Sequence, residues 1–263
     1  MSDNPVFLKL QWAEKRLREL DVFLHSFRSH PQPFVIKEDP ETKWKLYCLA
    51  SDPVIDPAIP LLAGDILQSL RSALDYLANA LVVANGKEPT TDTSFPISKK
   101  TPLADGYESA FTRKVTGMRQ DAIDLIESIK PYKGGNPYLW PIHELNNRDK
   151  HRLLFTVGAY LEHFGLVQHI DATNMPLEQM ERMGRAMLSD MSGAEVRKAT
   201  YPLKAGSVLL VDRADAKPNY QAQFLIQIAL DEAGVFEGEP LFSVVWQGFH
   251  EIVKVIGAFR GMY

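Results

Sequence analysis

The residues best suited to chemistry gather in one run of ten, residues 143–152, with the sequence HELNNRDKHR. The run contains two histidines, two carboxylates, two amides and three cations, and an apolar stretch follows it. Histidine titrates near neutral pH and can move protons, and a neighbouring cation can stabilise a developing negative charge. These residue types suit metal-independent RNA cleavage, in which His151 would act as acid and base and Arg148 or Lys150 would contact phosphate.

A helix expected over residues 141–163 would position this run. At about 100° per residue, Asp149 falls in the middle of the apolar face that includes Ile142 and Leu145. A buried carboxylate is costly unless it is paired and hydrogen-bonded. We therefore expect Asp149 to meet a cation, either Arg152 one turn later in the same helix or Arg71 from another helix. His143, Asn147 and Lys150 lie together on a different face.

A second helix, expected over residues 61–84, carries a polar ladder formed by Gln68, Arg71, Ser72, Asp75 and Asn79. Arg71 and Asp75 are four residues apart, which is the spacing of a helical ion pair. The ladder is either a solvated surface or a face that meets the 143–151 segment. In the second case the two helices share a polar network, for which the candidates are Arg71, Asp75, His143, Asp149 and Arg152.

The pattern of apolar residues predicts an α+β fold, mostly a helical bundle of about five to seven helices with a small antiparallel sheet. The sheet would combine an N-terminal hairpin over 34–49 with C-terminal strands. We expect a single domain over 1–263, helical to about residue 165 and mixed over 166–263. The remaining helices are expected at 7–27, 104–114, 119–129, 176–191 and 241–259, and the late strands at 166–170, 205–211 and 223–229.

Composition narrows the classes of function. The 263 residues carry a formal net charge of −4, are 45% hydrophobic and include one cysteine, Cys48. No basic excess indicates a general nucleic-acid surface. Cys48 is expected to be a small buried hydrophobe. No metal-binding or nucleotide-binding motif occurs, so we expect neither a metal nor a cofactor. The longest apolar stretch, 61–83, contains charges and does not suit a membrane span, so a cytoplasmic protein is expected.

Four segments resemble a family of bacterial proteins to which no activity is assigned: LRSALDYLA at 70–78, FPI at 95–97, KPYK at 130–133 and LNNRDKHRLL at 145–154. The resemblance covers about residues 60–160 and keeps the order of the segments. It implies no particular function.

A looser similarity is to HEPN domains, which are helical, usually dimeric and often metal-independent ribonucleases of toxin or phage-defence systems. Their motif is an arginine followed after four to six residues by a histidine. In this chain only two residues separate Arg148 from His151, so the spacing departs from that motif. If the similarity extends to function, Asn147, Arg148 and His151 would stand in for the catalytic residues.

Two hypotheses follow. The first is a binding or structural module in which a buried polar lock joins the helices at 61–84 and 141–163, with a protein or RNA partner. The second is a HEPN-like ribonuclease. The apolar C-terminal helix at 241–259 also suggests a homodimer.

Overall fold

The computed structural model describes residues 4–30, 32–152, 157–165, 201–215 and 223–263. In this part the chain forms six helices and five strands, which confirms the mostly helical α+β fold. Contacts divide the chain into two compact units. Unit 1 consists of residues 1–23, 56–157 and 230–263, and unit 2 of residues 24–55 and 158–229. This division does not test whether residues 1–263 form a single domain, which therefore remains a prediction.

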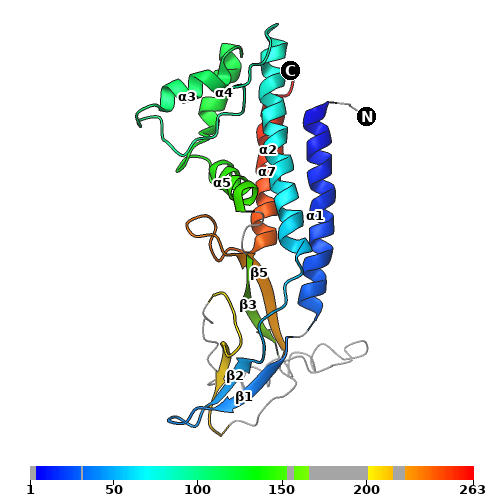
Figure 1. Cartoon of the computed structure of the whole chain (residues 1–263), viewed down its shortest axis with the longest axis vertical. Helices are drawn as coiled ribbons and strands as arrows, with labels where there is room; N and C mark the ends of the chain where they lie inside the picture. The colour runs from blue at the N-terminus through cyan, green and yellow to red at the C-terminus, as the bar shows by residue number, and fades with distance from the viewer. Residues whose placement is uncertain (1–3, 31, 153–156, 166–200, 216–222) are drawn as a thin grey trace, which may run out of the picture. The chain divides into compact units, whose positions relative to one another are not determined.

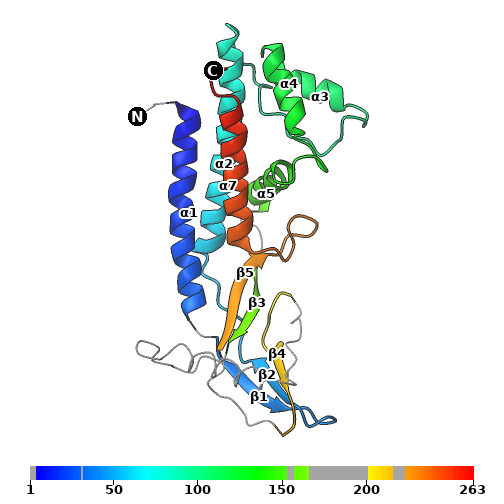
Figure 2. The same ribbon diagram turned by 180° about the vertical axis from the view of Figure 1, so that it is seen from behind.

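Unit 1 is built on three long helices: α1 (Pro5–Ser29), α2 (Ala58–Ala84) and α7 (Leu241–Ala258). They lie side by side in both ribbon views (Figures 1 and 2). Each places apolar residues at helical spacing and buries them, which confirms the helices expected at 7–27, 61–84 and 241–259. No helix in the described part of the chain is long and apolar enough to cross a membrane.

Two shorter helices, α3 (Tyr107–Val115) and α4 (Gln120–Ile129), confirm those expected at 104–114 and 119–129. The segment before α3 is anchored by Phe95, whose side chain is fully buried. Its ring packs edge-on against Phe259, with centroids 6.4 Å apart. This anchor holds the loop against the long helices.

Helix α5 (Leu139–Arg152) carries the polar run. The Asn136 side-chain oxygen accepts hydrogen bonds from the backbone amides of Tyr138 and Leu139, as a helix cap does. The helix expected to extend to residue 163 ends at Arg152, and strand β3 (Val157–Gly165) follows. That extension was wrong because Val157 and Tyr160 belong to residue types that fit a pleated sheet well.

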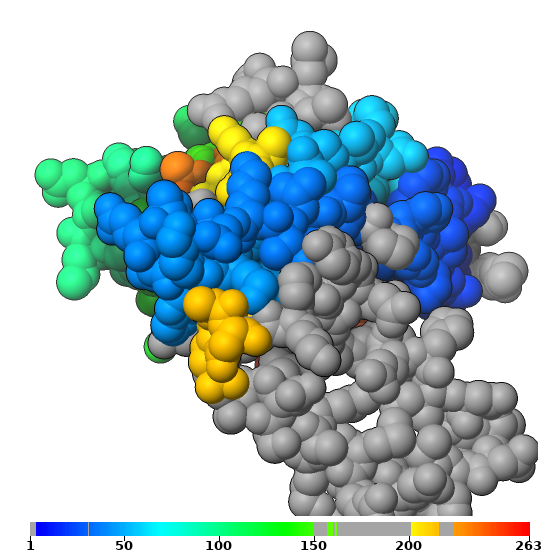
Figure 3. Space-filling view, turned by 90° about the horizontal axis from the view of Figure 1, so that it is seen from below, coloured from blue at the N-terminus to red at the C-terminus, as the bar shows by residue number. Residues whose placement is uncertain are grey.

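Unit 2 contains the hairpin predicted at 34–49. Strand β1 (Phe34–Glu38) pairs antiparallel with β2 (Lys45–Leu49), and β2 pairs antiparallel with β4 (Val208–Asp212). The pairing of β2 with β4 confirms the small antiparallel sheet built from the N-terminal hairpin and a C-terminal strand. Strand β5 (Gln223–Leu230) pairs with β3 in a second sheet of two strands. The hairpin occupies the centre of Figure 3. The strand expected at 166–170 and the helix at 176–191 lie outside the described residues.

Candidate functional site

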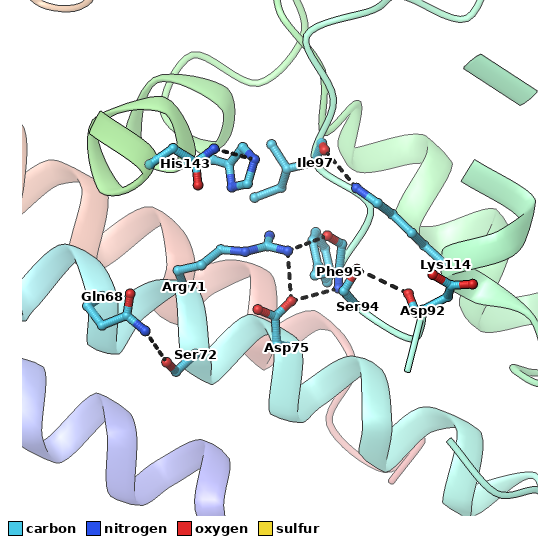
Figure 4. A network of polar contacts seen from close by, with 11 residues as sticks. Gln68, Arg71, Ser72, Asp75, Asp92, Ser94, Phe95, Ile97, Lys114 and His143 are labelled. Carbon is cyan, nitrogen blue, oxygen red and sulfur yellow. Dashed lines mark hydrogen bonds and ion pairs between the residues drawn. The ribbon is translucent and has the colours of Figure 1, made fainter. Parts of the chain in front are cut away.

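The polar ladder of α2 clamps a loop. Arg71 is buried, at 7% exposed, whereas the Asp75 side chain is 35% exposed, so the ladder is buried at Arg71 and only partly at Asp75. Arg71 Nη2 donates to Asp75 Oδ1 at 2.7 Å and to the carbonyl of Phe95 at 2.9 Å. Asp75 Oδ1 in turn accepts the backbone N–H of Phe95 at 3.1 Å. We call these groups, Arg71, Asp75 and the Phe95 backbone, the loop clamp (Figure 4).

Burial shapes the electrostatics of the loop clamp. Desolvation lowers the pKa of Arg71, and the charge of Asp75 opposes this effect. Desolvation also lowers the pKa of Lys114, and the nearby charge of Arg71 lowers it further. Lys114 Nζ donates to the carbonyl of Ile97 at 3.2 Å, so this cation is also bound to the loop (Figure 4). Both cations of this region are therefore engaged by protein acceptors.

Helix α5 approaches α2 where α2 has a glycine. A Cβ atom built on Gly64 would lie 2.7 Å from Asp149 Oδ2 and 3.0 Å from Asp149 Cγ. Only a residue without a side chain allows this approach, because real Cβ atoms do not come so close to other atoms. The polar run of α5 thus packs against α2 at Gly64. However, Asp149 lies beside Gly64, two turns from Arg71, and Arg71 pairs with Asp75 instead.

Arg148 makes three hydrogen bonds to protein oxygens. Its Nη1 donates to Glu232 Oε2 at 3.0 Å and to the carbonyl of Ala233 at 3.1 Å, and its Nε donates to Glu144 Oε1 at 3.2 Å. The Glu232 side chain is 3% exposed and comes from the turn between β5 and α7. We call Arg148, Glu144, Glu232 and the Ala233 carbonyl the arginine lock. Sequence reasoning missed Glu232.

The arginine lock limits what Arg148 can do. Burial on its own lowers the pKa of Arg148, but its hydrogen bonds and charge interactions with Glu232 and Glu144 outweigh this effect and raise it. Two carboxylates surround one guanidinium, and three of its N–H groups are directed at protein oxygens. A phosphate that approached the remaining N–H groups, those of Nη2, would face the negative charge of both carboxylates.

Two neighbouring amides of α5 have different surroundings. Asn147 Nδ2 lies 3.1 Å from His143 Nε2, one helical turn away. The amide nitrogen and the ring nitrogen lie within hydrogen-bonding distance. This contact confirms that His143 and Asn147 share a face. Asn146 is 1% exposed, and neither its Oδ1 nor its Nδ2 has a hydrogen-bond partner in the described structure.

Asn146 lies on the same face of α5 as two residues that meet other helices. Ile142, one turn earlier, packs against Gly248 of α7, and Asp149, nearly one turn later, packs against Gly64 of α2. A buried amide without partners costs stability. Asn146 therefore differs from Ile142 and Asp149, which pack against other helices from the same face of α5.

The remaining candidates, Lys150, His151 and Arg152, form the last turn of α5 by their backbone. Their side chains lie outside the described residues. The structure therefore brings together Arg71 with Asp75, His143 with Asn147, and Arg148 with Glu144 and Glu232. The proposed groupings of Arg148 with His151 and of Asp149 with Arg152 stay predictions.

Comparison with known proteins gives no assignment, because no protein family, no curated protein and no solved structure matches this chain.

Proposed function

We propose that the protein is a binding module in which the charged run of α5 serves as a structural lock. In this proposal the lock fastens α5 to α2 and to the turn that precedes α7, and binding takes place on other surfaces. The resemblance to a bacterial family of unassigned activity stays a prediction and adds nothing to this choice.

The observation that carries the proposal is the engagement of Arg148. Its guanidinium has three protein acceptors, and one of them, Glu232, is almost fully buried. A buried carboxylate with an arginine partner is strongly destabilised when that partner is lost. A residue with this task is poorly suited to bind and release a phosphate in each catalytic cycle.

The test separates the module from the alternative, a HEPN-like ribonuclease. Single-stranded and double-stranded RNA are incubated with the wild type, with His151→Ala and with a control, His25→Ala, which removes an exposed histidine of α1. Melting temperatures are measured for all three proteins. We expect no cleavage by the wild type above the buffer rate.

The ribonuclease would be established, and our proposal would fail, if the wild type and His25→Ala cleave RNA and His151→Ala does not. The melting temperature of His151→Ala must then equal that of the wild type. A fall in melting temperature of His151→Ala, without cleavage by any variant, would extend the lock to His151.

Cytoplasmic location and a homodimer belong to the same proposal. The apolar residues of α7 that suggested a dimer are mostly buried within unit 1, among them Val244, Val245 and Ile252. Trp246 and Val253 remain exposed at 45% and 38%. Light scattering at high protein concentration tests the dimer, and a mass of one chain throughout would exclude it.

A further inference from the structure

The two halves of α5 are held by different kinds of contact. Four apolar side chains of the first half are buried: Leu139, Trp140, Ile142 and Leu145. The second half, residues 146–152, contains no apolar residue. Most of the stability of a helix in a protein comes from packing of its apolar face. The second half of α5 therefore lacks the contribution that holds the first half in place.

Polar contacts also fasten the start of α5 to α7. Asn136 Nδ2, just before the helix, donates to Glu251 Oε1 at 2.7 Å. The Tyr138 hydroxyl donates to Gln247 Oε1. Together with the buried apolar side chains, these contacts make the first half of α5 a fixed part of unit 1.

The buried side chain of the second half favours exposure to water. Among residues 146–149 only Asn146 is buried. Its Oδ1 and Nδ2 are sealed from solvent and have no hydrogen-bond partner in the described structure. A buried polar group without a partner is destabilising, and water would supply its hydrogen bonds if the helix moved away. Asn146 thus opposes the packing of its own half of the helix.

The sequence weakens the second half of the helix as well. Asn146, Asn147 and Asp149 are residue types of low helix propensity, well below leucine and glutamate. They fall together in a stretch of four residues. This half of α5 therefore gains little stability from its own backbone preference.

The arginine lock acts against these effects. Arg148 Nη1 donates to Glu232 and to the carbonyl of Ala233, both in the turn before α7. These bonds reach outside the helix, whereas the Asn147 amide lies at hydrogen-bonding distance from His143 of α5 itself. The second half of α5 is thus fastened to the rest of unit 1 by a contact that water can replace.

We propose that the arginine lock is a latch, and that the second half of α5 opens and closes while its first half and the rest of unit 1 stay folded. The pairing of Arg148 with Glu232 stabilises the closed state, and hydration of the Asn146 amide favours the open state. Opening withdraws Asp149 from α2 and uncovers that helix at Gly64. The inference rests on the proposed function, because it adds a movement to the structural lock.

The experiment is amide hydrogen exchange of the full chain, followed residue by residue by NMR at increasing urea concentrations. A local opening exposes little surface and depends weakly on urea, whereas exchange through global unfolding accelerates steeply. We expect the amides of residues 147–149 to exchange about 100-fold faster than those of residues 143–145, with a weak dependence on urea.

The latch is tested by removing its arginine. Arg148→Met is expected to speed exchange at residues 147–149 by about tenfold or more, because the closed state loses its bonds to the turn before α7. Arg113→Met is the control, since it removes an arginine from an exposed ion pair of α3. It should leave these exchange rates unchanged.

A matched pair of asparagine variants tests the open state. Asn146→Leu and Asn147→Leu both introduce a residue of higher helix propensity, but only the first removes a sealed amide without a partner. We expect Asn146→Leu to slow exchange at residues 148 and 149 about fivefold more than Asn147→Leu does.

Three results would each overturn the latch. The first is exchange at residues 147–149 that is as slow and as steeply dependent on urea as at residues 143–145. The second is an unchanged rate in Arg148→Met, and the third is an equal effect of the two asparagine variants. A latch that fails in the first way leaves the structural lock intact. Cleavage of RNA that depends on His151 would instead defeat the proposed function, so the two failures are distinguishable.

Discussion

Replacement of Gly64 by alanine gives a sharp test of how α5 sits on α2. A glycine in the middle of a helix costs about 1 kcal/mol relative to alanine, so the substitution alone should stabilise α2. The added Cβ would lie 2.7 Å from Asp149 Oδ2, and the carboxylate or the whole of α5 would have to move. Overpacking of this kind typically costs about 1–3 kcal/mol. We therefore expect Gly64→Ala to lower the free energy of unfolding by about 1 kcal/mol.

Two controls isolate the contact. Gly257→Ala lies in α7, where a built Cβ meets nothing within 4 Å, and should be neutral or stabilise by up to about 1 kcal/mol. Gly64→Ala introduced into an Asp149→Ala protein should reverse its sign and stabilise, because the obstructing carboxylate is gone. Urea unfolding followed by tryptophan fluorescence measures each value. If Gly64→Ala stabilises the wild type as Gly257→Ala does, α5 does not approach α2 as described.

Three further predictions concern buried groups. Asn146→Leu should leave the free energy of unfolding unchanged or raise it by up to about 1 kcal/mol, because the Asn146 amide has no hydrogen-bond partner in the described structure. A large loss of stability in urea unfolding would disprove this expectation. Arg71→Met should lower the free energy of unfolding by about 3 kcal/mol, because it breaks the loop clamp. The control Arg113→Met, at an exposed ion pair, should lower it by less than about 0.5 kcal/mol, and equal losses in the two variants would contradict the loop clamp. Burial raises the pKa of the Cys48 thiol, so there is a range of pH in which the thiol is protonated in the folded state and ionised in the unfolded chain. The stability linked to this difference is fully present at neutral pH and is lost as the pH rises through the raised pKa. Iodoacetamide at pH 8 should modify Cys48 at least 100-fold faster in urea than in buffer, and equal rates would show that the thiol is accessible.

Local patterns predicted much of this fold. The helices α1, α2 and α7 follow from apolar residues at helical spacing, and the β1–β2 hairpin follows from two apolar runs around a turn. The ion pair of Arg71 and Asp75 was also predictable, because both residues lie on one helix at a spacing that fixes their distance.

Local patterns in the sequence could not predict where α5 ends or which carboxylate pairs with Arg148. The apolar periodicity continues past residue 152, and strand β3 is stabilised by β5, more than 50 residues later in the chain. Glu232 lies 84 residues from Arg148 in a turn whose sequence, Asp-Glu-Ala-Gly, looks solvent-exposed. The only local signal was the surplus of cations in the run, which implied a carboxylate partner from elsewhere.

The claim that the run on α5 is structural is tested most directly by a double-mutant cycle on Arg148→Met and Glu232→Gln. Arg148→Met should lower the free energy of unfolding by about 3 kcal/mol, since it leaves the buried Glu232 carboxylate without its arginine. Glu232→Gln should lower it by about 1 kcal/mol, because glutamine keeps an acceptor oxygen and Arg148 keeps Glu144 and the Ala233 carbonyl. The double variant should lose about 2 kcal/mol less than the sum of the two. Single losses below about 0.5 kcal/mol, or losses that simply add, would contradict the arginine lock and return Arg148 to the candidates for catalysis.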